Sequence, residues 1–326
     1  MNSTYRIRPT EAKRKSRRIF LSRAFSAAGT LALFNSPVFN LFLLRAMGKS
    51  SLASSTPIKR QGKSVQQVID LILHEINAGA IAGTVDTIKF GDPNQLVTGI
   101  VSTMFPTIGV IEQAAALKAN FIIAHEPTFY NHADNLNWVP GNAIVVQKQA
   151  LLKKYGIAVW RCHDYWHRYN PDGILHGLLQ SAGWLPYLQH GTRVVDLGPS
   201  NSLALTTIVS HLKTTLSIGN LRFIGNPSQV CQRIVILPGS VGGQAQVAAI
   251  EQNKPDLLIV GEASEWETPE YVRDLQSTGG KTALVLLGHA VSEEPGMKWM
   301  AEWLSPKVPE IKVHHIASGD PFTWGS

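Results

Sequence analysis

Hydrophobic positions along the chain follow two alternating spacings. Near the start, Val65, Val68, Ile69 and Ile72 recur at the interval of an amphipathic helix, which predicts a helix over 62–74. Short apolar runs typical of buried strands then alternate with helical patterns. The expected strands are 96–103, 120–124, 157–162, 232–239, 256–261, 282–288 and 311–316, and the expected helices between them are 107–119, 143–156, 203–216, 242–254, 268–280 and 295–304.

This strand–helix–strand order predicts an α/β fold with mainly parallel sheets. A stretch rich in turn residues, Leu185–Asn201, separates two parts with the same rhythm. We therefore expect two related α/β halves, 54–191 and 192–326, with the strand carboxyl ends of both facing a site between them.

Charge is concentrated at one end of the 326-residue chain. The formal net charge is +7, but residues 1–53 hold ten Lys or Arg and one acidic residue, and the remainder holds 20 basic and 22 acidic residues. The body is thus mildly acidic, which argues against nucleic acid as a partner.

The basic N-terminal segment, residues 1–53, is typical of a targeting signal. Ser16-Arg17-Arg18-Ile19-Phe20-Leu21 is similar to a twin-arginine export motif, and small residues at Ser51-Leu52-Ala53 offer a cleavage site. A disordered basic arm or a membrane anchor are the alternatives, although Asn and Pro interrupt the apolar stretch 25–44. We expect an exported, periplasmic or extracytoplasmic protein that meets the membrane only transiently.

The two cysteines, Cys162 and Cys231, fit export without requiring it. They could form one disulfide, Cys162 could be a metal ligand beside His163, or both could be inert thiols.

Histidine and carboxylate residues gather where the expected strands end. His125-Glu126 follow one strand, His163-Asp164 and then His167 follow the next, and Glu262 ends a third. His289 ends a fourth strand, with Glu293 four residues further on. Ligands of open α/β sheets bind at strand carboxyl ends, and imidazole with carboxylate is a ligand set for zinc, manganese or iron.

Each of these residues also has an ordinary structural explanation. A single histidine at a strand end is commonly a hydrogen-bonded structural residue, and 163–167 could be a polar loop. Glu293-Glu294 before Pro295 also suits a helix that starts at Pro295. The repetition of such clusters at equivalent positions is what favours a metal site.

Two blocks of sequence resemble the NIF-three-like family. Phe90–Tyr130, "FGDPNQLVTGIVSTMFPTIGVIEQAAALKANFIIAHEPTFY", is similar to its opening block, which ends in a His-His-Pro ligand turn. Leu287–Leu304, "LGHAVSEEPGMKWMAEWL", is similar to its closing His-x-x-x-Glu-x-Pro-Gly block. The resemblance extends over 62–322 and implies two α/β halves, a toroidal hexamer and a dinuclear metal centre.

Residue by residue, the resemblance implies metal ligation by His125, His289 and Glu293, with Glu293 bridging both ions. The chain departs from the family pattern at two places: Glu126 replaces the second histidine, and His167 stands where the family has an aspartate ligand. The expected ligand set is therefore His125, Glu126, His167, His289 and Glu293, with Asp164 and His163 in reserve and Glu262 in the surrounding layer.

Such a centre, with two divalent ions of zinc, manganese or iron, implies a metal-dependent hydrolase of a small, anionic substrate. Glu126 and Glu293 are the candidate catalytic carboxylates, and Glu126, His167 or Asp164 could position water. The loop Leu237–Gln246 could bind a phosphate, or simply join a strand to a helix. Metal storage, delivery or sensing is the alternative function, and a structural ring is a third.

Overall fold

The computed structural model describes residues 62–324. The expected targeting signal, residues 1–53, lies outside the described residues. Within the described part, no helix is long and apolar enough to cross a membrane.

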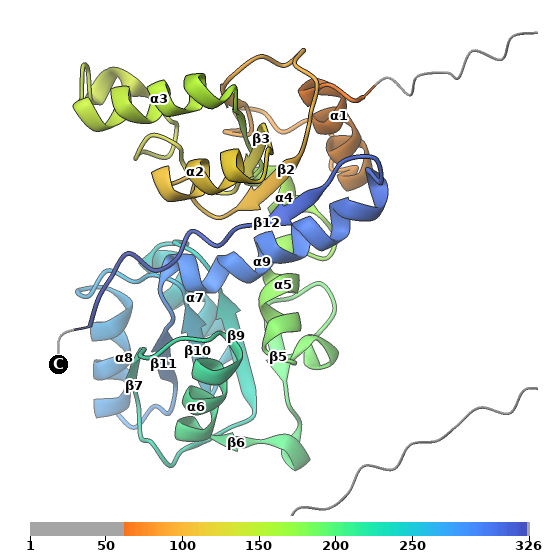
Figure 1. The fold of residues 1–326 in the computed structure, drawn as a ribbon. Coiled ribbons are helices and arrows are strands. Elements are labelled where there is room, and N and C mark those ends of the chain that lie inside the picture. The colour runs from red at the N-terminus through yellow and green to blue at the C-terminus, as the bar shows by residue number, and fades with distance from the viewer. Residues whose placement is uncertain (1–61, 325–326) are drawn as a thin grey trace, which may run out of the picture. The chain divides into compact units, whose positions relative to one another are not determined.

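Two five-stranded sheets form the framework (Figure 1). The first has the order β1-β4-β3-β2-β12, in which β4, β3, β2 and β12 are parallel and β1 is antiparallel to β4. Its strands are β1 (Ile88–Phe90), β2 (Ile100–Thr103), β3 (Phe121–Ala124), β4 (Ala158–Arg161) and β12 (Val313–His315).

The second sheet has the order β5-β9-β10-β11-β7, with three parallel central strands and an antiparallel strand at each edge. A small antiparallel pair, β6 with β8, lies apart from it. The strands are β5 (Val194–Asp196), β6 (Leu203–Ala204), β7 (Arg222–Ile224), β8 (Val230–Cys231), β9 (Arg233–Leu237), β10 (Leu257–Val260) and β11 (Ala283–Leu286). The predicted mixed α/β fold with mainly parallel sheets is confirmed.

Helices connect these strands and cover both sheets. Most follow the apolar periodicity of the sequence, and α3 ends where expected, at Gly156, whose left-handed backbone (φ 61°) forms the cap. The helices are α1 (Val65–Ile76), α2 (Ile108–Ala116), α3 (Ala143–Tyr155), α4 (Asp164–Arg168), α5 (Gly173–Ser181), α6 (Leu205–Thr215), α7 (Gly243–Asn253), α8 (Thr268–Ser277) and α9 (His289–Leu304).

The last strand does not follow a simple division of the chain into two consecutive halves. β12 pairs in parallel with β2, so the chain returns to the first sheet after completing the second. The long helix α9, which precedes β12, also packs on the first sheet. The division at residue 191 remains a prediction as a domain boundary.

Helix α9 begins six residues earlier than predicted. The helix starts at His289, and Pro295 lies inside it rather than at its first position. Proline at this place cannot donate to the carbonyl of Val291 and its ring crowds that carbonyl, yet the buried face of the helix continues across it to Met297 and Met300. Packing thus overrides the local signal, and His289 and Glu293 lie one turn apart on the same helix.

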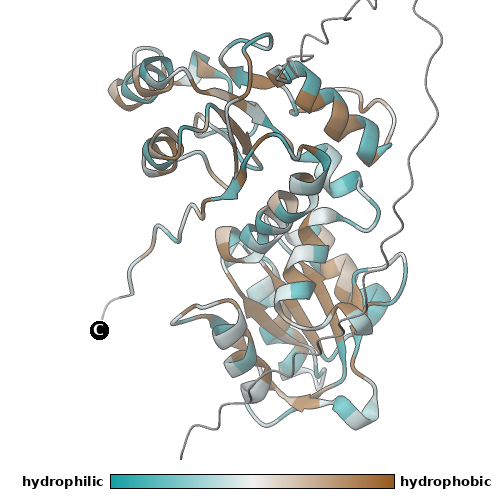
Figure 2. Ribbon diagram, turned by 45° about the vertical axis from the view of Figure 1, so that its right-hand side comes forward, coloured by the Kyte–Doolittle hydropathy of each residue, from teal (hydrophilic) through white to brown (hydrophobic). Residues whose placement is uncertain are grey.

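Close packing of α5 on α9 places the first turns of α9 (Figure 1). Gly177 approaches the backbone of Pro295, and Gly296 approaches that of Ile174, so closely that a side chain at either glycine would overlap the other helix. The hydrophobic strands of both sheets stand out against the mixed helices in Figure 2. α9 is therefore held between buried surfaces, which gives its N-terminal side chains fixed positions.

Candidate metal centre

The carboxyl ends of strands from both sheets supply one cluster of histidines and glutamates. His125 and Glu126 follow β3, His163 follows β4, and His289 follows β11. Glu293 adds its carboxylate from α9.

Short distances join the two sheets across this cluster. His125 Nε2 lies 3.4 Å from Glu293 Oε2, and His289 Nε2 lies 3.4 Å from Glu126 Oε1. Glu126 Oε1 is also 3.5 Å from His163 Nε2, and Glu293 Oε2 is 3.1 Å from His289 Nε2. Residues that are far apart in the sequence therefore lie close together in one cluster.

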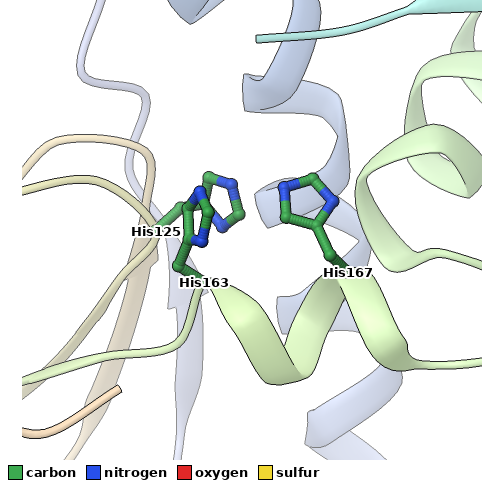
Figure 3. Close-up of side chains that lie close together, drawn as sticks. All are labelled: His125, His163 and His167. Atoms are coloured by element: carbon green, nitrogen blue, oxygen red, sulfur yellow. The ribbon is translucent and has the colours of Figure 1, made fainter. Parts of the chain in front are cut away.

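Two overlapping sets of three residues could each hold a metal ion. One is His125, His163 and His167, and the other is His125, Glu126 and Glu293; in each set the ligand atoms lie within 4.8 Å of one another. Figure 3 shows the three imidazoles gathered together, with His163 and His167 at the two ends of α4. The rings of His125 and His163 stack with centroids 4.6 Å apart.

All four histidines use Nδ1 for a hydrogen bond to a neighbouring group. The Nδ1 partners are the carbonyl of Cys162 for His125 (3.2 Å), Asp164 for His163 (2.9 Å), Asp172 for His167 (3.1 Å) and Glu262 for His289 (2.8 Å). Such partners accept the Nδ1 proton and orient each ring, so that a deprotonated Nε2 is the nitrogen that could bind a metal. His125 Nε2 is buried and makes no hydrogen bond.

Asp164 and His167 have different places in this arrangement. Asp164 Oδ1 contacts His163, while Oδ2 accepts hydrogen bonds from Thr84 Oγ1 (2.8 Å) and the Val85 amide (3.1 Å). Thr84 and Val85 thus hold the Asp164 carboxylate in place, and that carboxylate orients His163. His167 joins the cluster itself, with its ring centroid 5.0 Å from that of His125.

Three residues important to the geometry were missed in the sequence. Arg161 is fully buried and donates to Glu126 Oε2 (2.9 Å) and to the carbonyl of His125 (3.0 Å). Asp172 holds His167, and Asp86 accepts hydrogen bonds from three consecutive amides, 163–165, at the start of α4. Asp172 follows a proline and precedes an apolar run, which is a helix-start signal, but nothing in that signal points to His167.

Gly239, at the end of β9, permits the close packing of Glu293. Its φ is +69°, and a Cβ there would overlap the Glu293 carboxylate. The loop Leu237–Gln246 thus supports a candidate ligand directly.

The ionisation of the cluster reflects its mutual contacts. Burial opposes charge on His289, but hydrogen bonds to Glu126, Glu262 and Glu293 raise its pKa to about 12. Burial also opposes ionisation of Glu293, yet the nearby charge of His125 and the hydrogen bond from His289 hold the pKa of this carboxyl below its usual range. Burial, with the nearby charges of His125 and His167, lowers the pKa of His163 to about 4. Protonated imidazole thus offsets the negative charge of the carboxylates in this cluster, and a bound metal cation could take over that role.

A cavity of about 1200 Å³ adjoins the cluster. Glu126, His163, His167, His289 and Glu293 all line it, so the cluster is open to a small molecule. Further walls come from the start of α2, the loop 130–132, Lys148, Arg193, the loop 238–241 and the C-terminal residues 318–321.

Neither cysteine belongs to the cluster. Cys162 and Cys231 are free, buried thiols in different core clusters, and burial raises the pKa of both. Among the aromatic residues near the site, Tyr130 lines the cavity, Trp166 is buried in the core and Trp266 is 79% exposed.

Comparison with known proteins identifies a family. The sequence profile of Duf34/NIF3 (NGG1p interacting factor 3) matches residues 85–321. A Clostridium perfringens protein named GTP cyclohydrolase 1 type 2 homolog is 24% identical over 244 residues, covering 71% of this chain and 88% of its own. A protein of the same name from Chlamydia pneumoniae is 24% identical over 247 residues, covering 72% and 90%.

Solved structures share the fold. The Staphylococcus aureus protein SA1388 matches with a TM-score of 0.64 at 18% identity, over 80% of this chain and 99% of its own. A Bacillus cereus protein related to NIF3 matches with a TM-score of 0.64 at 14% identity, over 81% and 100%.

Proposed function

The chain belongs to the Duf34/NIF3 family, and on that premise we propose that its histidine and glutamate cluster binds divalent transition-metal ions. One observation carries the proposal. Four histidines each have Nδ1 occupied by an acceptor, and the Nε2 atoms of three of them, His125, His163 and His289, lie 3.1 to 3.5 Å from the carboxylates of Glu126 or Glu293.

The donor chemistry fits such ions. Imidazole nitrogens and carboxylate oxygens together suit zinc, manganese or iron, whereas calcium and magnesium prefer oxygen alone. The buried, unpartnered Nε2 of His125 is a costly feature in a protein interior, and a bound cation would supply its missing partner.

We propose two ions rather than one. His163 and His167 would hold the first together with His125, and Glu126, His289 and Glu293 would hold the second. Glu293 contacts both His125 and His289, which suits a carboxylate shared between two ions.

We further propose that the protein is a metal-dependent hydrolase of a small, anionic substrate. Divalent ions in such a centre would polarise an oxygen of the substrate and activate water. The cavity beside the cluster supports turnover, because a purely structural site is closed to other molecules. In this scheme Glu126 is the side chain best placed to hold the attacking water, since it lines the cavity while Arg161 fixes its orientation.

Metal analysis tests the first step of this proposal. Elemental analysis of the purified protein should give close to two transition-metal ions per chain, and a His289→Ala/Glu293→Ala double variant should lose at least the ion that these two residues would hold. The matched control is His74→Ala, since this exposed histidine lies on α1, away from the cluster. A wild-type protein that stays metal-free after reconstitution would show that the cluster is an ordinary polar network.

Turnover separates a hydrolase from a protein that stores, delivers or senses metal. The metal-loaded protein should release product from phosphate esters or nucleotides in a substrate screen, and the double variant should not. Metal that binds stoichiometrically but supports no hydrolysis, and exchanges quickly with a chelator, would favour the delivery function.

We also propose export through the N-terminal segment. The support is the Arg17-Arg18 pair and the apolar residues that follow it. Fusion of residues 1–60 to a reporter should direct export of the reporter, and Arg17→Lys/Arg18→Lys should abolish it. A homo-oligomer, and specifically a hexamer, is a further proposal, which light scattering of the purified protein tests.

A further inference from the structure

Lys148 is an unusual residue on the wall of the cavity. It lies on α3, its side chain is 3% exposed, and it lines the same cavity as the metal cluster. Its Nζ donates to the carbonyl of Thr128 (2.6 Å) and lies 5.1 Å from the centroid of the Tyr130 ring. Among the described residues, no carboxylate lies within ion-pair distance of this ammonium group.

A structural role does not require this charge. Lysine offers three N–H donors, and the carbonyl of Thr128 takes one of them. The nearest acidic influence is Asp134, whose carboxylate accepts from the Phe129 amide and pairs with Lys89 instead. Burial lowers the pKa of Lys148 to about 8, because the charge of Asp134 offsets only part of the loss of water around the ammonium group. An incoming anion would offset this buried positive charge and accept hydrogen bonds from the remaining N–H groups of Lys148.

The start of α2 lines the same cavity. Thr107 caps this helix by accepting a hydrogen bond from the Val110 amide, which leaves the amides of Ile108 and Gly109 in the first turn. Arg193 adds a half-exposed guanidinium, which it shares with Asp172. Two cationic side chains and the first turn of α2 thus line this cavity, together with apolar residues and the carboxylate of Glu262.

We propose that Lys148, with the first turn of α2, forms a subsite for the phosphate group of a phosphorylated small molecule. The cavity volume, about 1200 Å³, leaves room for a molecule of nucleotide size that extends from this subsite to the metal centre. Lysine is a common phosphate ligand as a point charge, and helix N-termini bind phosphate through their amides. The substrate class rests on the proposed hydrolase function, but the anion subsite itself does not.

Phosphate binding is measured first in the His289→Ala/Glu293→Ala variant, stripped of metal and kept in EDTA, so that metal ions cannot bind the probe. Equilibrium dialysis with labelled inorganic phosphate should show binding that Lys148→Met weakens at least tenfold. Lys154→Met is the matched control, because it removes an exposed lysine from the same helix and should leave binding unchanged. Malonate, as a carboxylate probe, should compete poorly.

Several outcomes would overturn the proposal: no phosphate binding at tens of millimolar, equal binding by Lys148→Met, or stronger competition by malonate than by phosphate. If Lys148→Met fails to fold, Lys148→Arg provides the test, since it keeps the charge and should keep the binding. Because these assays use metal-free protein, a failure of the metal proposal leaves their result intact.

Covalent labelling gives an independent measurement in the wild-type protein. Pyridoxal 5′-phosphate followed by borohydride should modify Lys148 at pH 8 at least tenfold faster than the exposed Lys154, and inorganic phosphate should protect it. Labelling of the two lysines at equal rates, without protection, contradicts a phosphate subsite at Lys148.

Discussion

The hydrogen bond from His167 to Asp172 offers a sharp test of the metal centre. Asp172 Oδ1 accepts from the amides of Ile174 and Leu175 at the start of α5. Both oxygens contact His167 Nδ1, Oδ2 at 3.1 Å and Oδ1 at 3.3 Å, and Oδ2 also accepts from Arg193. Asparagine has only one oxygen, so an Asp172→Asn side chain that keeps the helix amides loses the shorter of the two contacts with His167 Nδ1.

We expect the oxygen to stay with the helix, because asparagine is as good a helix cap as aspartate. The amide NH₂ would then replace Oδ2 beside His167 Nδ1 and favour the tautomer with the proton on Nε2, which blocks metal binding through Nε2. Loss of such a partner typically weakens metal binding by about 10- to 100-fold, or roughly 1.4–2.7 kcal/mol. The stability of the metal-free fold should change by less than about 1 kcal/mol, since the Arg193 ion pair is half-exposed.

Competition with a chromophoric chelator measures the affinity, and urea unfolding in EDTA measures the stability. The control is Arg193→Met, which removes the other partner of Asp172 but keeps the contact with His167. Its metal affinity should stay within about threefold of wild type. A folded Asp172→Asn protein with unchanged affinity for every metal would refute the reasoning, because His167 would then not be a ligand.

Three further predictions concern neighbouring parts of the site. Because the pKa of His289 is raised to about 12, its imidazole is protonated at neutral pH and must lose a proton to bind a metal. Metal affinity measured by chelator competition should therefore rise about tenfold per pH unit from pH 6 to 8 for each proton released, and a flat profile contradicts this. Gly239→Ala should lose at least tenfold in metal affinity, because the added Cβ would displace the Glu293 carboxylate. Gly242→Ala is the control: its backbone strain is similar (φ +82°), but no atom lies within 4 Å of the added Cβ, so its metal affinity should be unchanged. Glu294→Ala removes the acceptor of both the amide and hydroxyl of Ser318, so hydrogen exchange should show faster exchange at that amide, and unchanged protection there would argue against the contact.

The central strands were predictable because they are buried on both faces. β3 and β10 are runs of four buried residues, which appear in the sequence as unbroken apolar stretches. The edge strands gave no such signal: in β7, Arg222 and Phe223 are exposed, and the strand is only three residues long. The return of β12 to the first sheet is decided by its pairing with β2, which no local pattern records.

The candidate site was predictable only as a set of residue types at strand ends. Parallel strands place their carboxyl ends at one edge, so His125 and His289 could be expected to meet if the two sheets faced each other. The role of Asp164 could not be assigned, because its hydrogen bonds go to Thr84 and Val85, eighty residues earlier in the chain. Local sequence records which donors are present, and the tertiary contacts determine which of them face the site.

The same contacts explain how the chain accommodates its two departures from the family pattern. A glutamate in place of a histidine adds a negative charge to a buried site, and an unpaired buried charge is strongly unfavourable. Arg161, fully buried on the adjacent strand β4, donates to Glu126 and supplies the compensating charge. At the second departure, His167 brings an imidazole where the family has a carboxylate, and Asp172 restores a carboxylate directly behind it. Glu126 and His167, the two candidate ligands that differ from the pattern implied by the resemblance, thus each contact a charged side chain, Arg161 for Glu126 and Asp172 for His167.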